Sequence, residues 1–483
     1  MDPMHLFAPQ RVHRMLCAIG TWNPERHDSG FIVAREHRNV DDQIRLEHIA
    51  EAGVVGAGGA GFPTHVKLAG RADSVIINAA ECEPLLHKDK ELIQAYPEEV
   101  VRGLRIAMQL VGAERGYIGI KEKYHHAVDL LEPTLPSSIE IALLRDAYPA
   151  GDEFILVYDV LGRVIPPGGI PLHVGAVVIN VETALNIARA AAGPVIEKFL
   201  TIAGAVRTPV TLRVPLGVTL AECVRAAGGP TISDPNFMVG GVMMGRLEDN
   251  HAALVDKTTG GVIVLPDDHV VIRRRRQEWD EVARIGRSAC DQCSYCTELC
   301  PRWLLGHPIE PHKAMRSLGF NLVGEANVIG TSFCCECNLC SLYSCPEDLD
   351  PKNVCTQNKR RLAVEKRRWE DPPFNPRRPE LHLNNRKAPI TRLIQKLGLA
   401  GFDNVGPLRE SLLDTARVGI ALKQHVGAPC MSVVREGERV SRGQVVGRPP
   451  EVDGKPALGA PVHASIEGIV ESVTPNIVWI ARA

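Results

Sequence analysis

The residues that most clearly indicate chemistry in this sequence are its cysteines. Ten of the 14 lie between Cys290 and Cys355, and the other four are scattered along the chain. Small secreted domains use cysteines as a disulfide framework, whereas clustered cysteines in a long chain are more typical of metal ligands. The sequence therefore predicts a metal centre between residues 290 and 355.

Two runs in this segment have the spacing of bacterial ferredoxins. They read Cys290-x2-Cys293-x2-Cys296-x3-Cys300-Pro301 and Cys334-x2-Cys337-x2-Cys340-x4-Cys345-Pro346. Three cysteines at this spacing hold three corners of one cubane, and the cysteine before proline ligates the other cluster. Two zinc sites are the alternative, but zinc normally takes two Cys-x-x-Cys pairs.

We therefore expect two 4Fe–4S clusters whose fourth ligands are exchanged between the runs. Cys335 and Cys355 fall outside this pattern. Nearby charges and burial set cluster potentials over a wide range, so the pattern indicates electron transfer without fixing a potential. The expected ligand sets are Cys290, Cys293, Cys296 and Cys345 for one cluster, and Cys334, Cys337, Cys340 and Cys300 for the other.

A glycine-rich stretch at residues 53–67, GVVGAGGAGFPTHVK, is the second candidate site. Such loops bring backbone N–H groups close to phosphates, although a tight structural turn is the plain alternative. The stretch lacks the Gly-Lys-Ser/Thr ending of an ATP-binding P-loop. Asn78, Glu81 and Glu83 follow an apolar strand, and ligand crevices form where parallel strands end. Lys67 follows the loop and is placed to meet a phosphate.

The elements that must position these residues alternate between short strands and helices. This alternation indicates a mostly parallel sheet covered on both faces. The predicted strands are residues 74–78, 116–120, 154–160 and 176–179, and the predicted helix is 97–112.

The rest of the chain divides into smaller units. Strands at 210–214 and 261–265 around a helix at 220–227 indicate an α+β module. The run Arg273–Arg276 is expected at a domain joint, with an acidic docking partner as the alternative. The prolines and charges of residues 371–380 indicate an exposed linker, and period-2 runs from residue 425 indicate an all-β domain.

Composition limits the function classes. Lys and Arg total 55 and Asp and Glu total 57, so the net charge is −2 and predicts no nucleic-acid partner. Apolar stretches fall short of the ~20 residues that a membrane helix needs, so we expect no membrane span. Arg11, His13 and Arg14 interrupt any signal-peptide core. We therefore expect a soluble, cytoplasmic protein.

Four motifs, in order, resemble the flavin- and NADH-binding subunit of respiratory complex I. GAGGAGFPTHVK is similar to that family's glycine loop, and NAAECEP (78–84) to its N-A-D-E-x-E-P. YPAGDE (148–153) resembles its Gly-Glu-Glu segment, and NVET (180–183) matches its N-V-E-T. Three departures are Ala57 for arginine, Ala80 for aspartate and Asp152 for glutamate.

The resemblance implies an FMN site with NADH as electron donor. Its site residues fall into three groups, which the resemblance assigns to this chain's own positions. Those on the flavin phosphate side are Gly56, Gly58 and Lys67. Those that line the flavin are Asn78, Glu81, Gly151, Asp152, Asn180 and Thr183. Those that face the nicotinamide nucleotide are Gly59, Phe62 and Glu83.

The sequence resembles the C component of Rnf complexes and PduS-type cobalamin reductases of bacterial microcompartments more closely. The segments ECEPLLHKDKE (81–91) and GRVIPPGGIPLHVG (162–175) carry this resemblance. It implies that electrons pass from NADH through FMN and two 4Fe–4S clusters to cob(II)alamin. The implied partners are cobalamin or a cobalamin adenosyltransferase and a shell protein, with the compartment lumen as location and an oligomer left open. The alternative is an NAD⁺-regenerating or electron-wiring subunit that docks to a partner protein.

The resemblance also fixes the expected fold class and domains. It implies a Rossmann-like flavin/NADH domain, a β-grasp SLBB module, a two-cluster ferredoxin domain and a C-terminal barrel-sandwich. The last resembles biotinyl and lipoyl domains but reads Ser465-Ile466-Glu467-Gly468 where a carrier has its lysine, so we expect neither lipoyl nor biotin. We expect residues 1–40 to form an N-terminal arm that is disordered or serves in targeting. The expected bounds of the other units are 41–196 for the flavin domain, 197–268 for the SLBB module, 269–368 for the ferredoxin domain, 369–408 for a linker and 409–483 for the barrel-sandwich.

Overall fold

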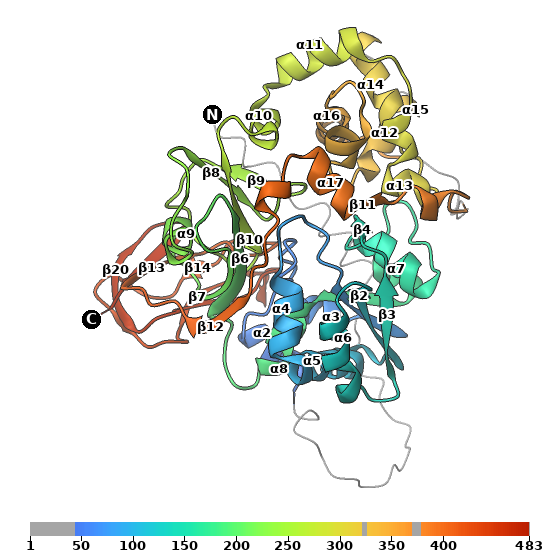
Figure 1. Ribbon diagram of the computed structural model, residues 1–483. Coiled ribbons are helices and arrows are strands. Elements are labelled where there is room, and N and C mark those ends of the chain that lie inside the picture. The colour runs from blue at the N-terminus through green and yellow to red at the C-terminus, as the bar shows by residue number, and fades with distance from the viewer. Residues whose placement is uncertain (1–43, 321–325, 370–377, 483) are drawn as a thin grey trace.

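A computed structural model describes residues 44–320, 326–369 and 378–482 of the chain (Figure 1). The expected N-terminal arm, residues 1–40, lies outside the described residues. The described chain forms an α/β domain, a mixed-sheet module, a helical cysteine-rich region and a C-terminal β domain. In Figure 1 the cysteine-rich region lies above the α/β domain, on the side of α7.

The first domain is built on a four-stranded parallel sheet in the order β3-β2-β1-β5. Its strands carry buried apolar runs because helices connect and cover them. The strands are β1 (Ser74–Ala79), β2 (Arg115–Lys121), β3 (Ile139–Leu144) and β5 (Ala176–Asn180). The helices are α2 (Leu46–Glu51), α3 (Thr64–Leu68), α4 (Lys88–Ala95), α5 (Pro97–Val111), α6 (His125–Leu131), α7 (Glu153–Leu161) and α8 (Val181–Arg189).

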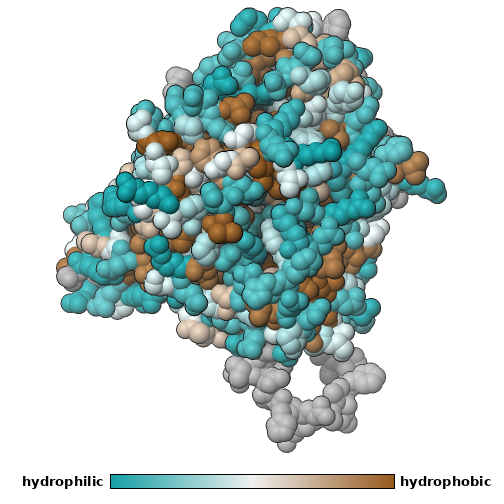
Figure 2. Space-filling view, in the orientation of Figure 1, coloured by the Kyte–Doolittle hydropathy of each residue, from teal (hydrophilic) through white to brown (hydrophobic). Residues whose placement is uncertain are grey.

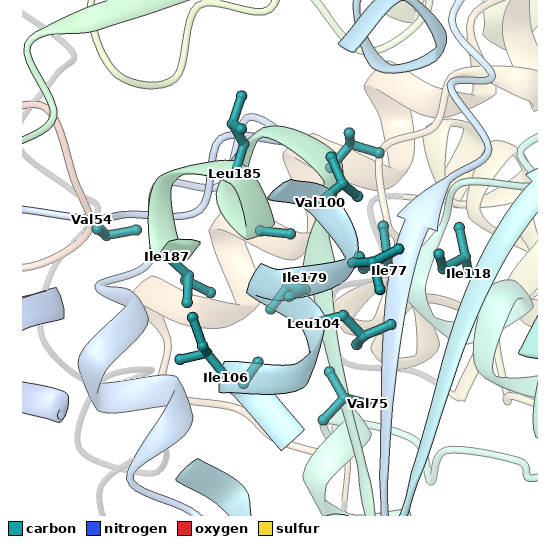
Figure 3. Packing of buried hydrophobic residues seen from close by; sticks show 14 of the residues in the cluster. Val54, Val75, Ile77, Val100, Leu104, Ile106, Ile118, Ile179, Leu185 and Ile187 are labelled. Atoms are coloured by element: carbon teal, nitrogen blue, oxygen red, sulfur yellow. The ribbon is translucent and has the colours of Figure 1, made fainter. Parts of the chain in front are cut away.

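The core of this domain depends on a close approach of α5 to α8. Figure 3 shows Val100, Leu104 and Ile106 of α5 beside Leu185 and Ile187 of α8. The contact is close because α5 has glycine at position 103, where a Cβ would lie 1.9 Å from the carbonyl oxygen of Ala184. Glycine at position 103 therefore sets how near α8 can pack to α5.

The strand predicted at 154–160 is wrong, because these residues form α7. Asp152 caps this helix by accepting hydrogen bonds from the amides of Phe154 (3.0 Å) and Ile155 (3.3 Å), and Gly162 ends it at φ 68°. A short apolar run has no periodicity that separates a buried strand from a buried helix. The other three predicted strands and the helix at 97–112 are confirmed.

The second unit is a six-stranded mixed sheet in the order β12-β7-β6-β10-β8-β9. The strands and the helix predicted here are confirmed. The elements are β6 (Glu197–Gly204), β7 (Val210–Pro215), α9 (Leu220–Ala226), β8 (Pro235–Val239), β9 (Arg246–Glu248) and β10 (Gly261–Pro266), with β12 (Leu408–Leu412) added from later in the chain.

The arginine run forms the joint between this sheet and the cysteine-rich region, as the default interpretation predicted. It ends α10 (Val270–Arg276), and two of its side chains reach in opposite directions. Arg275 Nη2 donates to the carbonyl of Met243 at 2.7 Å, whereas Arg274 Nη2 donates to the carbonyl of Leu349 at 2.7 Å. Because each guanidinium binds backbone of a different unit, α10 holds the two units together.

The cysteine-rich region consists of short helices around two cysteine loops. Cys300 and Cys345 are each followed by a proline, and Pro301 begins a helix. The elements are α11 (Trp279–Ala289), α12 (Tyr295–Glu298), α13 (Pro301–Leu304), α14 (Pro311–Phe320), α15 (Ala326–Ile329), η5 (Gly330–Phe333), the π-helical turn η6 (Cys340–Ser344) and α16 (Pro351–Val364).

The expected linker is packed structure over most of its described part. β11 (Ala388–Pro389) pairs with β4 (Ala147–Tyr148) of the first domain, and α17 (Ile390–Lys396) buries its apolar face. Two short turns, η7 (Leu383–Asn385) and η8 (Ala400–Phe402), flank them. Of the proline-rich stretch 371–380, residues 371–377 lie outside the described residues, and helical structure is present from residue 390.

The last domain is a sandwich of two small antiparallel sheets with a hairpin. The turn at Ser465 is buried, and Ser465 Oγ donates to the carbonyl of Leu216 at 2.5 Å, so this turn docks on the neighbouring sheet. The first sheet contains β13 (Arg417–Ala421), β21 (Ile477–Ala481), β20 (Gly468–Val473) and β15 (Arg439–Val440). The second contains β14 (Met431–Ser432), β16 (Val445–Arg448) and β19 (Val462–His463), and the hairpin is β17 (Glu451–Val452) with β18 (Lys455–Pro456).

The surface seen in Figure 2 is mainly hydrophilic, with hydrophobic residues in small scattered groups. Among the residues described, every helix is too short or too polar to cross a membrane.

Candidate functional site

The glycine-rich loop joins α2 to α3 and lies open at its tip. It closes on itself through bonds from Gly56 N to Phe62 O (2.9 Å) and from Gly61 N to Gly56 O (3.2 Å). Gly59 has φ 103°, and a Cβ there would have nothing within 4 Å. The exposed tip, residues 58–60, therefore leaves room for a ligand against the backbone. Phe62 is buried, at 9% exposure.

The loop lies across the carboxyl ends of β1 and β5. Ala57 N donates to Thr183 Oγ1 at 2.9 Å, and a Cβ on Gly58 would lie 3.4 Å from Cβ of Asn180. At the end of β1, Asn78 Nδ2 donates to the carbonyl of Gly151 at 2.8 Å. The structure thus brings together four of the sequence motifs at one edge of the sheet, where doubly wound folds bind ligands.

Lys67 points from α3 to the sheet. Its ammonium donates to the carbonyl of Val178 at 2.9 Å and pairs with Glu153 at 3.3 Å. Its side chain is 26% exposed, so it retains access to solvent at the edge of the site.

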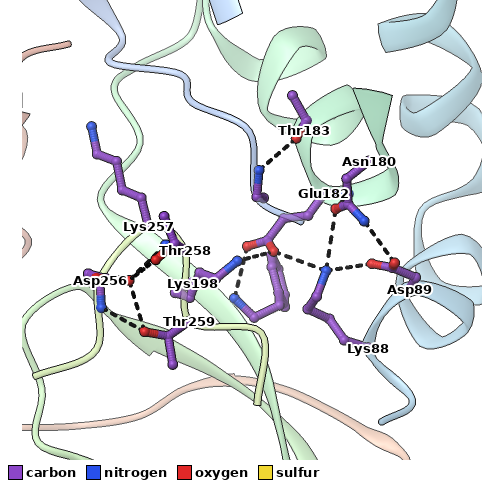
Figure 4. A network of polar contacts seen from close by, with 12 residues as sticks. Lys88, Asp89, Asn180, Glu182, Thr183, Lys198, Asp256, Lys257, Thr258 and Thr259 are labelled. Atoms are coloured by element: carbon purple, nitrogen blue, oxygen red, sulfur yellow. Dashed lines mark hydrogen bonds and ion pairs between the residues drawn. The ribbon is translucent and has the colours of Figure 1, made fainter. Parts of the chain in front are cut away.

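Behind the loop lies a buried charge network that the sequence reasoning missed. Figure 4 shows Lys88, Asp89, Glu182 and Lys198 together with Asn180. Lys88 Nζ lies 3.3 Å from Glu182 and also pairs with Asp89, while Lys198 pairs with Glu182. The two lysines and two carboxylates balance in charge, as buried ions require. Lys88 and Asp89 lie within ECEPLLHKDKE, and Glu182 within NVET, so the quoted motifs already contained the signal.

The network connects to the flavin motif through two further contacts. Asn180 Nδ2 donates to Asp89 Oδ2 at 2.8 Å, and Asp89 N donates to Glu81 at 2.9 Å. Burial and then the charge of Asp89 raise the pKa of Glu81 to about 8. Both causes favour the protonated, uncharged form of Glu81.

Glu83 binds the neighbouring sheet module. Its carboxylate accepts hydrogen bonds from the amides of Met243 (2.9 Å) and Met244 (2.7 Å). Burial raises the pKa of Glu83 to about 7, although these two hydrogen bonds favour the charged form. Glu83 is expected to face the nicotinamide nucleotide, but its carboxylate is engaged in this contact between the sheet module and the flavin motif.

Asp152 joins the loop edge to the cysteine-rich region. Besides capping α7, its carboxylate accepts a hydrogen bond from Arg302 Nη2 at 2.8 Å. Both side chains are nearly buried, at 11% and 9% exposure. Arg302, which follows Cys300 and Pro301, is therefore bound to Asp152, which follows Gly151 of the flavin motif.

The first expected set of cysteines surrounds one cavity. Cys290, Cys293, Cys296 and Cys345 line it, together with His312 and other side chains of the same region. Four thiols from two loops around one space are the donor set that a 4Fe–4S cluster takes. The cysteine before Pro346 thus lies with the first loop.

The second expected set lies together, with two further cysteines beside it. Cys340 lies within electrostatic range of Cys334, Cys296 and Cys300, and Cys337 within that of Cys335, Cys340 and Cys300. Cys335 contacts Cys337, whereas Cys334 contacts Cys355. The structure therefore places Cys335 and Cys355 next to the set that the spacing selected.

Cys334 and Cys335 are the two candidates for the thiolate that completes the second cluster beside Cys300, Cys337 and Cys340. Replacing each of them by serine, one at a time, separates these candidates. We expect Cys334→Ser to lose the second cluster and Cys335→Ser to keep it, because only Cys334 has the two-residue spacing to Cys337. Iron and sulfide content after anaerobic purification measures the outcome. The assignment of Cys334 is wrong if the Cys335→Ser protein is the one that loses iron.

Comparison with known proteins gives four domain matches. They are the Nuo51 FMN-binding domain (residues 49–189), the SLBB domain (199–247), a 4Fe–4S dicluster domain (289–350) and the RnfC barrel-sandwich hybrid domain (408–482). Together with the sheets described above, they confirm the predicted fold class.

Relatives that match over nearly their whole length decide the family. Cobalamin reductase PduS of Citrobacter freundii is 43% identical over 92% of this chain and 97% of its own length. PduS of Salmonella typhimurium is 43% identical over 91% and 97%. The chain belongs to the PduS cobalamin reductase family. The C component of the Na(+)-translocating ferredoxin:NAD(+) oxidoreductase complex of Acetobacterium woodii is 34% identical over 54% of this chain and 59% of its own.

Membership of the PduS family confirms the resemblance read from the motifs. This PduS-type chain is an oxidoreductase with an FMN-binding domain followed by a 4Fe–4S dicluster domain. Its open glycine loop and its four-cysteine cavity fit these two kinds of cofactor.

Proposed function

We propose that this protein transfers electrons from NADH through FMN and two 4Fe–4S clusters to cob(II)alamin. The observation that carries the proposal is the ion pair between Asp152 and Arg302, which fixes the flavin-domain edge to the cysteine-rich region. FMN supplies hydride acceptance and one-electron release, while the protein supplies binding and orientation. The relatives named cobalamin reductase support cobalamin as the acceptor.

The chain's own residues have distinct roles in this proposal. Backbone amides of the open loop tip would bind the flavin phosphate, with Lys67 at its edge. Asn180 and Thr183 hold the loop in place, as their contacts with Gly58 and Ala57 support. The remaining residues proposed at the flavin and nucleotide are Gly56, Gly59, Phe62, Asn78, Glu81, Glu83, Gly151 and Asp152.

The two cysteine sets would each bind one cluster. A count of two is supported by the cavity around Cys290, Cys293, Cys296 and Cys345 and by the second group around Cys300 and Cys337. The product cob(I)alamin would pass to a cobalamin adenosyltransferase, and a shell protein would hold the reductase in a compartment lumen.

One observation favours a second function, an electron-wiring subunit without its own NADH site. Two of the three residues expected to face the nucleotide are engaged within the protein: Phe62 is buried, and Glu83 binds the amides of Met243 and Met244. Such a subunit would receive electrons from a docked partner.

Anaerobic stopped-flow mixing separates the two functions. We expect NADH to bleach the absorbance of FMN-loaded protein within seconds, and cob(II)alamin added afterwards to restore it. NADPH serves as a matched control for the donor. Flavin that stays oxidised with NADH but is reduced by dithionite would contradict the NADH-dependent function and support the wiring subunit.

A further inference from the structure

The segment with the second cysteine run packs directly on the flavin domain. Tyr148 of β4 is 1% exposed, and its hydroxyl donates to the carbonyl oxygen of Cys337 at 2.6 Å. Tyr148, Leu85 and Cys337 share one hydrophobic cluster.

A second connection starts beside Cys300. Arg302 pairs with Asp152, and its guanidinium lies 3.8 Å from the centroid of the Phe154 ring on α7. Arg302, two residues after Cys300, therefore ties this cysteine to the flavin domain.

Two more contacts complete this interface. His307 Nε2 lies 2.9 Å from the carbonyl oxygen of Ile165, and the ring of Phe333, next to Cys334, lies 3.5 Å from where a Cβ on Gly168 would be. In Figure 1, α13 lies beside α7 and β4, whereas α11 and α14 lie farther from the flavin domain.

The first cysteine run has different surroundings. Every residue that lines its cavity lies between positions 290 and 351, so the walls come from the cysteine-rich region itself. Tyr295, between Cys293 and Cys296, is 52% exposed. The set of Cys290, Cys293, Cys296 and Cys345 thus lies within the cysteine-rich region and near solvent, while Cys300 and Cys337 of the other set lie beside the flavin domain.

We infer that electrons leave the flavin domain through the inner cluster, held by Cys300, Cys334, Cys337 and Cys340. They leave the protein through the outer cluster, held by Cys290, Cys293, Cys296 and Cys345. The inference rests on the proposed function and adds an order to it. The hydride of one NADH brings two electrons to the flavin. These pass singly to the cluster of Cys300 and Cys337, then to that of Cys290 and Cys345, while the flavin's protons return to solvent.

Two matched variants test the order. Cys337→Ala removes a ligand of the inner cluster, and Cys290→Ala one of the outer cluster. After mixing with NADH, freeze-quench electron paramagnetic resonance follows the cluster that remains, and dithionite shows that it is present and reducible. We expect Cys290→Ala to reduce its inner cluster at the wild-type rate. We expect Cys337→Ala to bleach its flavin normally but to lose rapid reduction of the outer cluster.

The opposite pattern overturns the inference, as does rapid reduction of the outer cluster in Cys337→Ala. Flavin that NADH fails to bleach in the wild type contradicts the proposed function instead. In that case photoreduction of the bound flavin loads the electrons, and the same two variants still decide the order.

Tyr148 is the positioning residue of this interface. Tyr148→Phe removes only the hydroxyl that binds the carbonyl of Cys337, and we expect it to shift the potential of the inner cluster alone, because this hydrogen bond fixes the backbone that carries the Cys337 thiolate. The control Tyr295→Phe changes an exposed tyrosine and should leave both potentials unchanged. A redox titration that shows an unchanged inner potential, or a shift of the outer one, would refute this role.

Discussion

Replacing Glu182 by alanine should lower the free energy of unfolding of the flavin domain by about 3–5 kcal/mol, because removing one partner of a buried ion pair leaves uncompensated charge. The Glu182 side chain is 1% exposed; it pairs with Lys198, lies 3.3 Å from Lys88 and accepts a bond from Phe199 N at 3.1 Å. Because Glu182 lies in the first turn of α8, which also carries Thr183, the variant should lose FMN as well. Urea unfolding followed by circular dichroism, with flavin fluorescence for retention, measures both effects.

An exposed ion pair provides the matched control. Glu471→Ala removes a carboxylate that pairs with Arg417 at 2.6 Å, where the side chains are 40% and 53% exposed. Such pairs contribute about 0.2–1 kcal/mol, so this variant should unfold almost like the wild type. If Glu182→Ala and Glu471→Ala lower stability equally, the buried network does not stabilise the domain as we propose.

Exchange of the fourth ligand between the cysteine runs predicts a specific pattern of iron loss. Cys345→Ala and Cys290→Ala should each lose about half of the iron, since both cysteines would bind the same 4Fe–4S cluster. The double variant Cys290→Ala/Cys345→Ala should then lose no more than either single variant. Cys290→Ala/Cys300→Ala should lose nearly all of it, because it affects both clusters.

Iron, sulfide and visible absorbance of anaerobically purified variants measure this pattern. The double variants are decisive because two substitutions that only destabilise the protein would have additive effects on iron content, whichever two cysteines are replaced. If Cys290→Ala/Cys345→Ala loses all of its iron while Cys290→Ala/Cys300→Ala keeps half, each run binds its own cluster and the exchange is refuted.

The strand predicted at 154–160 shows where local pattern was insufficient. The run FILVYDV is apolar and β-branched enough for a buried strand. The deciding signals were the cap Asp152 before it and Gly162 after it, which define a helix. The same capping residue then binds Arg302, a contact between residues 150 positions apart that sequence spacing does not contain.

The expected linker illustrates a related limit. Prolines and charges predict an exposed linker, but they do not show whether neighbouring residues find a partner. β11 pairs with β4, more than 200 positions earlier, and α17 buries Ile390 and Leu393. β4 belongs to the flavin domain, and α17 packs in a cluster that also contains Cys337 of the cysteine-rich region, so both partners lie far away in the sequence.

The sequence by itself determined the chemistry of this protein: the cysteine spacings select 4Fe–4S clusters, and four ordered motifs select a flavin domain. These signals are local, because a ligand loop must carry its donors within a few residues. Only the tertiary structure decided that Lys88, Asp89, Glu182 and Lys198 balance one another, and that Tyr148 and Arg302 face the second run. Burial and charge pairing depend on which elements meet in space, and that information is spread over the whole chain.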